Sequence, residues 1–458
     1  MTARELASAL SDKRISAREI TRYYLDVAEK INPSLQAYIT VCEESAEREA
    51  ELADRLIAEE KANFLTGIPL SVKDNICTKG VRTTGASKML CDYVPMYDAT
   101  VIKTIKQNGG VILGKCDMDE FAMGAFGENS ALSECRNPID DTFSPGGSSS
   151  GVGAAVAAGL SSWGLGSDTG GSLRIPASFC GCVGFKPTYG AISRYGLISY
   201  ASSMDTVGII TKTADDACLI SPHLFGKDMR DMTSNVISCK VEELYNLTGI
   251  TFSFSEEDMA EAEAEIQEVL HKTAHILTKL GAKCISRSAL PSADADYAYS
   301  VISCAEAMSN LARYDGIRFG GDGTLSTGKV RESLFGDVVR ERIEYGNFVL
   351  REENFDAIYL AAQNLRDRID AELTSLFDEA DIVLSPLVDF SVPKRGETEH
   401  LRADKFTVSA NFAGVPAISL PLGKDENGMP ISVQLMSGKG RDGFLLSVAR
   451  LLEKEAAI

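Results

Sequence analysis

The sequence of 458 residues contains no apolar stretch of 18 residues, about the length that a helix needs to cross a membrane. Residues 1–5 also lack the start of the hydrophobic segment that a signal peptide carries. Hydrophobic residues make up 44% and charged residues 24%, which is typical of globular proteins in water. The sequence therefore predicts a cytoplasmic protein without membrane contact.

The eleven cysteines include no C-x₂-C pair, so the sequence predicts neither a zinc site nor a disulfide framework. The closest pair, Cys180 and Cys182, is expected to pack as small apolar side chains. His271 and His275 lie four residues apart on a predicted helix, a spacing that can bind a metal. Because no third ligand is evident, we expect an exposed helix face and no metal site.

Positive charge is also in short supply. Lys and Arg total 46 against 65 Asp and Glu, which gives a formal net charge of −19. Nucleic-acid surfaces neutralise phosphates with Lys and Arg. The charge therefore argues against this chain as the main surface for a nucleic acid, which a partner would have to carry.

Histidine is scarce as well, with four in the chain and none in residues 144–188, the most glycine- and serine-rich stretch. No Lys-Ser or Lys-Thr follows its glycine pairs at the spacing of a phosphate-binding P-loop. Ser172 does not stand in a G-x-S-x-G nucleophile elbow. A Ser-His-Asp triad is disfavoured, although a histidine distant in sequence remains an alternative.

This stretch contains two glycine pairs that each run into a serine, at Ser148 and at Ser172. Glycines let the backbone approach a ligand closely, and successive N–H groups in such a turn bind anions. A serine there can attack a carbonyl while neighbouring N–H groups hold the oxyanion. A flexible linker is disfavoured because Val152, Trp163 and Leu165 interleave with the serines.

A serine nucleophile without a histidine needs another base, and Lys73 is the candidate. Lys73 comes directly after residues 67–72, a short apolar run that predicts a buried strand, and Asp74 is the next residue. Burial lowers the pKa of a lysine and can leave it neutral, able to accept a proton. The alternative is a lysine that reaches solvent with Asp74 as a surface partner. The residues alone leave both interpretations open.

Three separated motifs, GIPLSVKDNICTKG around Lys73, PGGSSSG around Ser148 and GSDTGGSLRIPASFCG around Ser172, resemble the amidase signature family. The resemblance implies a Ser-cisSer-Lys triad. In it, Ser172 is the nucleophile, Ser148, which follows a cis peptide bond, relays the proton, and Lys73 is the base. It also implies an oxyanion hole formed by the amides of Thr169, Gly170 and Gly171.

The segments EFAMGAFGENSALSECRNP, GFKPTYGAISRYGLISYASSMDTVG and SNLARYDGIRFG resemble one branch of the family, the A subunits of tRNA-dependent amidotransferases. The likeness is weakest over residues 222–300. It implies a glutaminase that supplies ammonia to convert Glu-tRNA(Gln), and possibly Asp-tRNA(Asn), to the amide form. It further implies a heterotrimer with B and C subunits. The B subunit would hold the tRNA and use ATP and Mg²⁺, with no cofactor in this chain.

In this branch the resemblance implies that Arg342 and Asp404 bind the charged groups of glutamine, and that Ser149 and Gly124 line the substrate site. Thr206, Ile210 and Ser300 depart from the branch's usual Gln, Pro and Tyr. Ser300 is expected to alter the pocket, which leaves a stand-alone amidase for another small amide as the alternative. A scaffold without catalysis is disfavoured by the triad.

The predicted fold class is α/β, a single large domain over residues 1–458 with a mixed β-sheet sandwiched between helices. Within it we expect N-terminal helices over 1–60, the signature core over 61–220, and the rest of the sheet with the substrate pocket over 221–458. The pattern predicts the local elements in chain order, with a helix break at Asn32-Pro33: strand 68–72, helix 100–107, a strand after Gly110, helix 151–159, strand 163–167, strand 251–254, helix 256–280 and strand 283–286.

Overall fold

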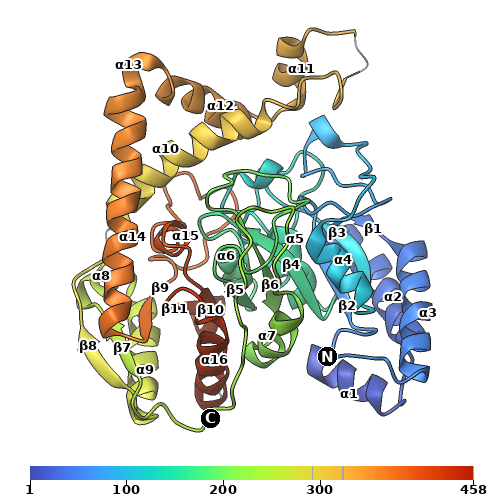
Figure 1. The fold of residues 1–458 in the computed structure, drawn as a ribbon, viewed down its shortest axis with the longest axis horizontal. Helices are drawn as coiled ribbons and strands as arrows, with labels where there is room; N and C mark the ends of the chain where they lie inside the picture. The colour runs from blue at the N-terminus through green and yellow to red at the C-terminus, as the bar shows by residue number, and fades with distance from the viewer. Residues whose placement is uncertain (291, 322–323, 457–458) are drawn as a thin grey trace.

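A computed structural model describes residues 1–290, 292–321 and 324–456, and its centre is one mixed sheet (Figure 1). The strand order across the sheet is β1-β3-β2-β4-β6-β5-β10-β11-β9-β7-β8. The strands are β1 (Tyr38–Val41), β2 (Pro69–Lys73), β3 (Val111–Cys116), β4 (Trp163–Asp168), β5 (Val183–Lys186), β6 (Thr206–Thr211), β7 (Thr251–Phe254), β8 (Lys283–Ser286), β9 (Ile382–Pro386), β10 (Ala417–Lys424) and β11 (Pro430–Ser437).

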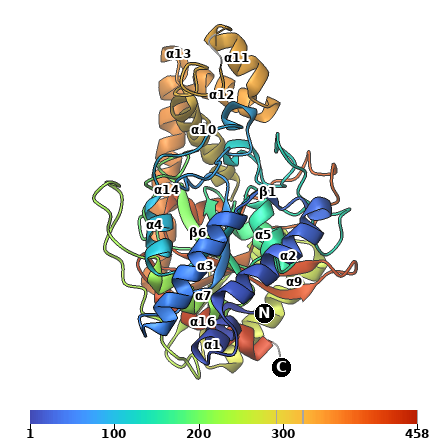
Figure 2. The same ribbon diagram turned by 90° about the vertical axis from the view of Figure 1, so that its right-hand side faces the viewer.

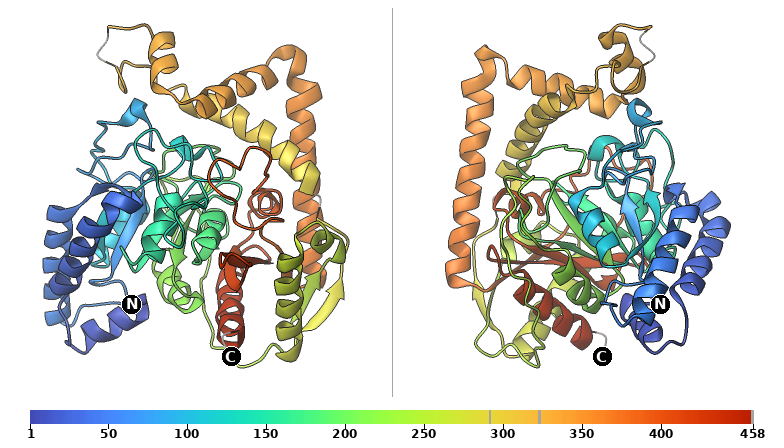
Figure 3. Two further views of the ribbon diagram at one scale, coloured as in Figure 1. Left: turned by 180° about the vertical axis from the view of Figure 1, so that it is seen from behind. Right: turned by 45° about the vertical axis from the view of Figure 1, so that its right-hand side comes forward.

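Helices cover the sheet, so that the predicted α/β sandwich is confirmed (Figures 1 and 3). The α-helices are α1 (Ala3–Ser11), α2 (Ala17–Leu35), α3 (Glu43–Ala58), α4 (Thr100–Gln107), α5 (Ser150–Ala157), α6 (Arg174–Phe179), α7 (Ala214–Ile220), α8 (Glu256–Ala260), α9 (Ala264–Lys279), α10 (Ser292–Leu311), α11 (Thr327–Leu334), α12 (Asp337–Val349), α13 (Glu352–Asn354), α14 (Ala361–Glu379), α15 (Val408–Phe412) and α16 (Asp442–Ala456). Short 3₁₀ turns at Lys88–Leu90, Glu120–Ala122 and Ser221–His223 and a π-helix at Phe355–Leu360 complete them.

The middle of the sheet is buried on both faces. Every residue of β2, β3, β4, β5 and β6 is buried, as expected for strands that read as near-continuous apolar runs rather than alternating ones. β2 runs parallel to β3 and β4, whereas β6 is antiparallel to β4 and β5. Because β2 and β4 are parallel, their carboxyl ends meet at one edge of the sheet.

Helix α5 packs against β2 and β4 at close range. Its side chains are small, and a Cβ atom added at Gly151 would overlap the carbonyl oxygen of Ala37. At Gly153 an added Cβ would lie 2.7 Å from the carbonyl oxygen of Pro176. The small residues therefore bring the start of α5 close to the carboxyl ends of the central strands.

The N-terminal region differs from its prediction in two ways. β1 interrupts the expected helical stretch and pairs with β3. Pro33 does not break its helix, because α2 continues through it to Leu35 and ends at Gln36 in the left-handed conformation. The side chain of Asn32 bonds the N–H of Tyr38 at 2.8 Å and its carbonyl at 3.1 Å. This double contact holds the last turn against the first residue of β1.

The region after residue 250 contains the two predicted strands, β7 and β8, which pair in parallel. The predicted helix 256–280 is divided into α8 and α9. Ala262 is buried between them, and the N–H of Glu263 bonds the carbonyl of Asp389 at 3.0 Å. This contact with the segment after β9 turns the chain between the two helices.

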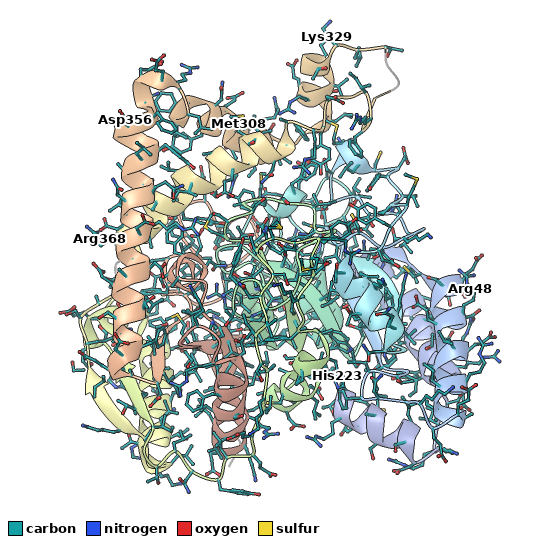
Figure 4. All side chains as sticks on the ribbon, viewed as in Figure 1. Arg48, His223, Met308, Lys329, Asp356 and Arg368 are labelled. Atoms are coloured by element: carbon teal, nitrogen blue, oxygen red, sulfur yellow. The ribbon has the colours of Figure 1, made fainter. Side chains whose placement is uncertain are left out.

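Helices α10 to α14 form a helical arm that rises beside the sheet and crosses above it (Figures 1 and 2). In Figure 4, Asp356 and Lys329 lie at opposite upper corners of the arm, and Met308 lies on α10 between them. The arm packs on α15 through α10 and α14. It therefore covers the edge of the sheet that carries the glycine-serine loops.

Within the described residues, no helix is long and apolar enough to cross a membrane. The same residues contain no cluster of His, Cys, Asp and Glu that could hold a metal ion. His271 and His275 lie on the exposed face of α9, and Cys180 and Cys182 are buried, as the sequence predicts.

The close packing of α5 makes a prediction about Gly151→Ala. In most helices this change stabilises, because alanine exceeds glycine in helix propensity by about 1 kcal/mol. Here the added methyl group overlaps backbone, so we expect a lower melting temperature in thermal unfolding followed by circular dichroism. Gly328→Ala on α11, where an added Cβ meets nothing within 4 Å, is the matched control and should be neutral or stabilising. Equal melting temperatures for the two variants would contradict the packing argument.

Candidate active site

Lys73, Ser148 and Ser172 come together at the carboxyl edge of the central strands. Lys73 is the last residue of β2, and Ser148 lies just before α5. The Lys73 Nζ atom lies within hydrogen-bond distance of Ser148 Oγ, at 2.7 Å, and the Gly147–Ser148 peptide bond is cis. Ser172 follows β4, and its carbonyl accepts from the Ser149 N–H at 3.0 Å. The structure thus brings together the three residues that the motifs predict.

Lys73 is fully buried, so the interpretation as a surface lysine is wrong. Its neighbour Asp74 does not pair with it, because Asp74 Oδ1 lies 3.2 Å from the Nζ atom of the equally buried Lys115. Burial lowers the pKa of Lys73 to about 7, against the attraction of the carboxylates of Asp119, Asp168 and Asp205. A lysine with this pKa is substantially neutral near pH 7 and can act as a base.

The loop between β4 and α6 holds Ser172 and keeps it nearly covered, with 6% of its surface exposed. Gly171 has φ of +126°, a conformation for which glycine is suited, and an added Cβ would overlap the hydroxyl of Thr407. Thr407 donates that hydroxyl to the carbonyl of Gly170. The glycines therefore permit a tight turn that is fastened to the segment before α15.

The predicted oxyanion hole is altered in one respect. The N–H of Gly171 donates to Asp168 Oδ1 at 2.9 Å, so this amide is already occupied. In the described part of the chain, no hydrogen bond engages the amides of Thr169, Gly170 or Ser172. These three N–H groups are the donors that remain for a developing oxyanion.

Asp168 and Arg174 brace the loop through a buried ion pair. Both are fully buried, and Arg174 Nη2 lies 2.9 Å from Asp168 Oδ1 while Nε bonds Oδ2, also at 2.9 Å. Burial alone would raise the pKa of Asp168, but Arg174 holds the pKa well below its usual range. Arg174 also bonds the side chain of Asn411 at 2.7 Å, which ties the loop to α15.

Arg342 and Asp404 reach the site from different elements, α12 of the helical arm and the segment before α15. Burial lowers the pKa of Arg342, but Tyr200, Tyr299 and Asp404 raise it above its ordinary value. Burial and Asp296 raise the pKa of Asp404 to about 6, while Arg342 opposes the change. No ion pair within 4.0 Å joins Arg342 to Asp404 among the described residues. The two charges are therefore not paired directly with each other.

Two tyrosines that sequence reasoning missed complete this pocket. Arg342 Nη1 donates to the hydroxyl of Tyr200, and its guanidinium lies 5.4 Å from the centre of the Tyr200 ring. Tyr299 of α10 packs so close to Gly170 that a Cβ added there would lie 2.7 Å from the Tyr299 ring. Tyr200 stands within one of the branch motifs, which could have indicated it, whereas Tyr299 lies outside all of them. Tyr299 thus stands between the oxyanion loop and the arginine.

Ser149 and Gly124 lie beside the triad, but their recorded contacts are internal. The Ser149 hydroxyl donates to the carbonyl of Ser167 at 3.2 Å. A Cβ on Gly124 or on Gly147 would overlap the carboxylate of Asp119, so both glycines admit that buried side chain next to the triad. A contact of Ser149 or Gly124 with substrate stays a prediction.

A family model described as Amidase matches residues 19–446. The chain belongs to the amidase family. The match spans all the elements that carry the triad, the oxyanion loop and the pocket.

Among curated relatives of this amidase, the glutamyl-tRNA(Gln) amidotransferase A subunit 2 of Clostridium acetobutylicum is 42% identical over an alignment of 472 positions, which covers 99% of each chain. The crystal structure of the glutamyl-tRNA(Gln) amidotransferase A subunit from Thermotoga maritima is 36% identical, with a TM-score of 0.81, over 99% of this chain and 94% of that one. A structure from the study of a vestigial complex and an s-triazine catabolic enzyme is 27% identical, with a TM-score of 0.87, over 99% and 98%. Fold similarity alone therefore does not separate the amidotransferase branch from other amidases.

Ser300 is expected to alter the substrate pocket, but the position of Ser300 in the structure does not support this. Ser300 is exposed on α10, whereas the adjacent Tyr299 is buried against the oxyanion loop. Thr206 and Ile210 are buried in β6. The pocket therefore keeps a tyrosine at residue 299, and the departure at residue 300 lies on the surface.

The environment of Lys73 predicts the pH dependence of this amidase. The base works when neutral, and its pKa is lowered to about 7. Protonation as the pH falls through 7 removes the base, so kcat/KM should drop about tenfold per pH unit on the acid side. The measurement is kcat/KM from pH 5 to 8 under conditions where chemistry limits the rate. A profile without an acid limb in this range would contradict a lysine base.

Proposed function

We propose that this amidase is the glutaminase subunit of a tRNA-dependent amidotransferase, which hydrolyses glutamine and supplies the ammonia to a partner subunit. The observation that carries the proposal is the pairing of a Ser-cisSer-Lys triad with Arg342 and Asp404, two opposite charges that no ion pair joins among the described residues. Similarity to amidotransferase A subunits over 99% of the chain supports the choice of branch.

Glutamine has a carboxylate and an ammonium at one end and an amide at the other. Arg342 suits the carboxylate, because a guanidinium binds carboxylates through two parallel N–H bonds. Asp404 suits the ammonium, and a bound cation would lower the raised pKa of Asp404 and keep it ionised. The two charges thus hold the amino-acid end in the pocket while the amide points to Ser172.

In the acylation step, the Ser172 hydroxyl attacks the side-chain amide carbon and passes its proton to Ser148, whose own proton goes to neutral Lys73. The negative oxygen of the tetrahedral intermediate accepts from the amides of Thr169, Gly170 and Ser172. One such donor contributes about 3–4 kcal/mol to the transition state. The proton then returns from Lys73 through Ser148 to the leaving nitrogen, the C–N bond breaks, and ammonia departs.

Deacylation repeats the sequence with water. Lys73 and Ser148 take a proton from a water molecule that attacks the ester carbon, and the same amides hold the second oxyanion. Collapse of this intermediate breaks the bond to Ser172 Oγ and releases glutamate. The triad then returns to its starting protonation, because the proton that Lys73 accepted passes back to Ser172.

The assembly that we propose contains B and C subunits and works in the cytoplasm. The net charge of −19 makes this chain a poor surface for phosphates, so the B subunit would bind the tRNA and use ATP and Mg²⁺. Free ammonia in water becomes protonated and loses its nucleophilicity, which favours a closed path to the partner. Glu-tRNA(Gln), with or without Asp-tRNA(Asn), would receive the amide.

The proposal is tested by comparing two nitrogen donors. Arg342→Ala and Asp404→Ala should each lower tRNA amidation from glutamine by about 100-fold, since each removes a charged contact of about 2–3 kcal/mol. Amidation from ammonium chloride should stay within about twofold of wild type, because free ammonia does not use this site. The measurement is amidated tRNA formed by the reconstituted complex from each donor.

Arg351→Ala and Glu399→Ala are matched controls that remove exposed charges near the same elements. These two variants should amidate tRNA at wild-type rates from both donors. If amidation from glutamine and amidation from ammonium chloride fall equally in assembled Arg342 and Asp404 variants, these residues do not bind glutamine. A stand-alone amidase would be favoured if the chain without partners shows full glutaminase activity and the complex forms no amidated tRNA.

A further inference from the structure

The amine of Lys73 contacts a second hydroxyl that the triad mechanism does not use. Besides Ser148, the Nζ atom bonds Ser167 Oγ at 3.0 Å and the carbonyl oxygen of Ser167 at 3.4 Å. In the parallel register of β2 and β4, Val72 lies opposite Leu165, which brings Lys73 level with Gly166. Ser167 is the next residue along β4, and both its hydroxyl and its carbonyl reach the amine.

Ser167 is held in turn by Asn75. The Asn75 Nδ2 atom donates to Ser167 Oγ at 3.0 Å, and the side chain is 1% exposed. The other end of the same amide, Oδ1, has no hydrogen-bond partner among the described residues. Burying an unpaired amide oxygen is unfavourable, and an apolar residue would avoid it. The hydrogen bond that its N–H donates to Ser167 explains why an asparagine occupies this position.

The direction of these bonds decides whether Lys73 can take a proton. A neutral amine has two N–H groups and one lone pair. The carbonyl of Ser167 can only accept, so one N–H points there. The second N–H and the lone pair are shared between the hydroxyls of Ser148 and Ser167. Lys73 acts as a base toward Ser148 only if its lone pair faces Ser148, which requires Ser167 to accept rather than donate.

Ser167 accepts in both contacts. The N–H groups of Asn75 and Lys73 fill the two acceptor positions of Ser167 Oγ, which turns the Ser167 proton away from the amine. Without Asn75, the Ser167 hydroxyl could rotate and donate to the lone pair of Lys73. That bond would stabilise the neutral amine but direct its lone pair away from Ser148.

We propose that Asn75 is a positioning residue for the base, acting through the Ser167 hydroxyl to keep the lone pair of Lys73 on Ser148. The inference rests on the triad of the proposed function but not on glutamine as the substrate. Asn75 touches neither substrate nor the reacting atoms, so its effect must be visible in the behaviour of Lys73.

The test follows the labelling of Ser172 by a fluorophosphonate probe as a function of pH, on the full-length chain. In this reaction Ser172 Oγ bonds phosphorus, fluoride leaves, and the serine proton passes through Ser148 to Lys73. The high-pH plateau reports how well the base works, and the midpoint of the acid limb reports its pKa. The carboxylates that face Lys73, those of Asp119, Asp168 and Asp205, are unchanged in every variant.

Two substitutions should move the midpoint in opposite directions. Asn75→Ala should lower the plateau by about 3- to 10-fold, the effect of one hydrogen bond, and move the midpoint to lower pH. In Asn75→Asp the new carboxylate accepts a hydrogen bond from the Ser167 hydroxyl. Ser167 therefore still accepts from Lys73, and the plateau should stay within about twofold of wild type. Its negative charge favours the ammonium form and should raise the midpoint by about one pH unit.

Asn32→Ala, which removes two asparagine hydrogen bonds far from the triad, is the matched control and should change neither the plateau nor the midpoint. A wild-type plateau and midpoint in Asn75→Ala would overturn the inference, as would a lowered or unchanged midpoint in folded Asn75→Asp. If Asn75→Asp does not fold, the plateau and midpoint of Asn75→Ala decide.

Wild-type protein that is labelled but does not hydrolyse glutamine contradicts only the glutaminase proposal. Wild-type protein without label on Ser172 overturns the triad and this inference together.

Discussion

The burial of one amine, the Nζ atom of Lys73, is the constraint on which the site depends. A lysine at the end of a fully covered strand loses its hydration, and this loss lowers its pKa to about 7. The nearby carboxylates limit the change, and among the described residues none of them forms an ion pair with the Nζ atom. Asp168 is held by Arg174, and Asp119 accepts amide N–H bonds at 3.0 and 3.2 Å. Burial therefore outweighs the attraction of these carboxylates and keeps the pKa of Lys73 low.

The site joins two parts of the fold with different tasks. The parallel pair β2 and β4, with the start of α5, provides the triad and the oxyanion loop. The helical arm provides Arg342 and Tyr299, and the segment before α15 provides Asp404. Thr407 and Arg174 connect the two parts, since they bond the oxyanion loop to the region of α15. Movement of the arm would therefore change the pocket and leave the hydrogen bond between Lys73 and Ser148 intact.

Much of the chemistry could be predicted from sequence because it depends on local backbone. Glycine pairs before Ser148 and Ser172 mark tight turns, and Lys73 ends an apolar run. Helix α4 was also predictable at its observed bounds, Thr100–Gln107. The strand β1 was not predicted, because it forms by pairing with β3, which is distant in the chain. The helix α2 continues past Pro33 to Leu35, next to the point where the side chain of Asn32 bonds Tyr38.

The finer features of the site were not accessible from the sequence, because they depend on how side chains orient and pack. Whether residue 299 or residue 300 faces the pocket depends on how α10 rotates against the core. The occupied amide of Gly171 depends on where Asp168 places its carboxylate. The contact of Asn75 with Ser167 joins the end of β2 to β4, and only the strand register brings these residues together. Motifs identify reacting groups, whereas packing determines their hydrogen bonds.

The central claim is that Ser172 forms a covalent ester with the side-chain acyl group of glutamine. The direct test is to mix the assembled complex with glutamine, stop the reaction with acid within milliseconds to seconds, and map the modified peptide by mass spectrometry. We expect a glutamyl ester on the peptide that contains Ser172, and none in the Ser172→Ala variant. An ester on another residue, or wild-type glutamine hydrolysis by Ser172→Ala, would contradict the account.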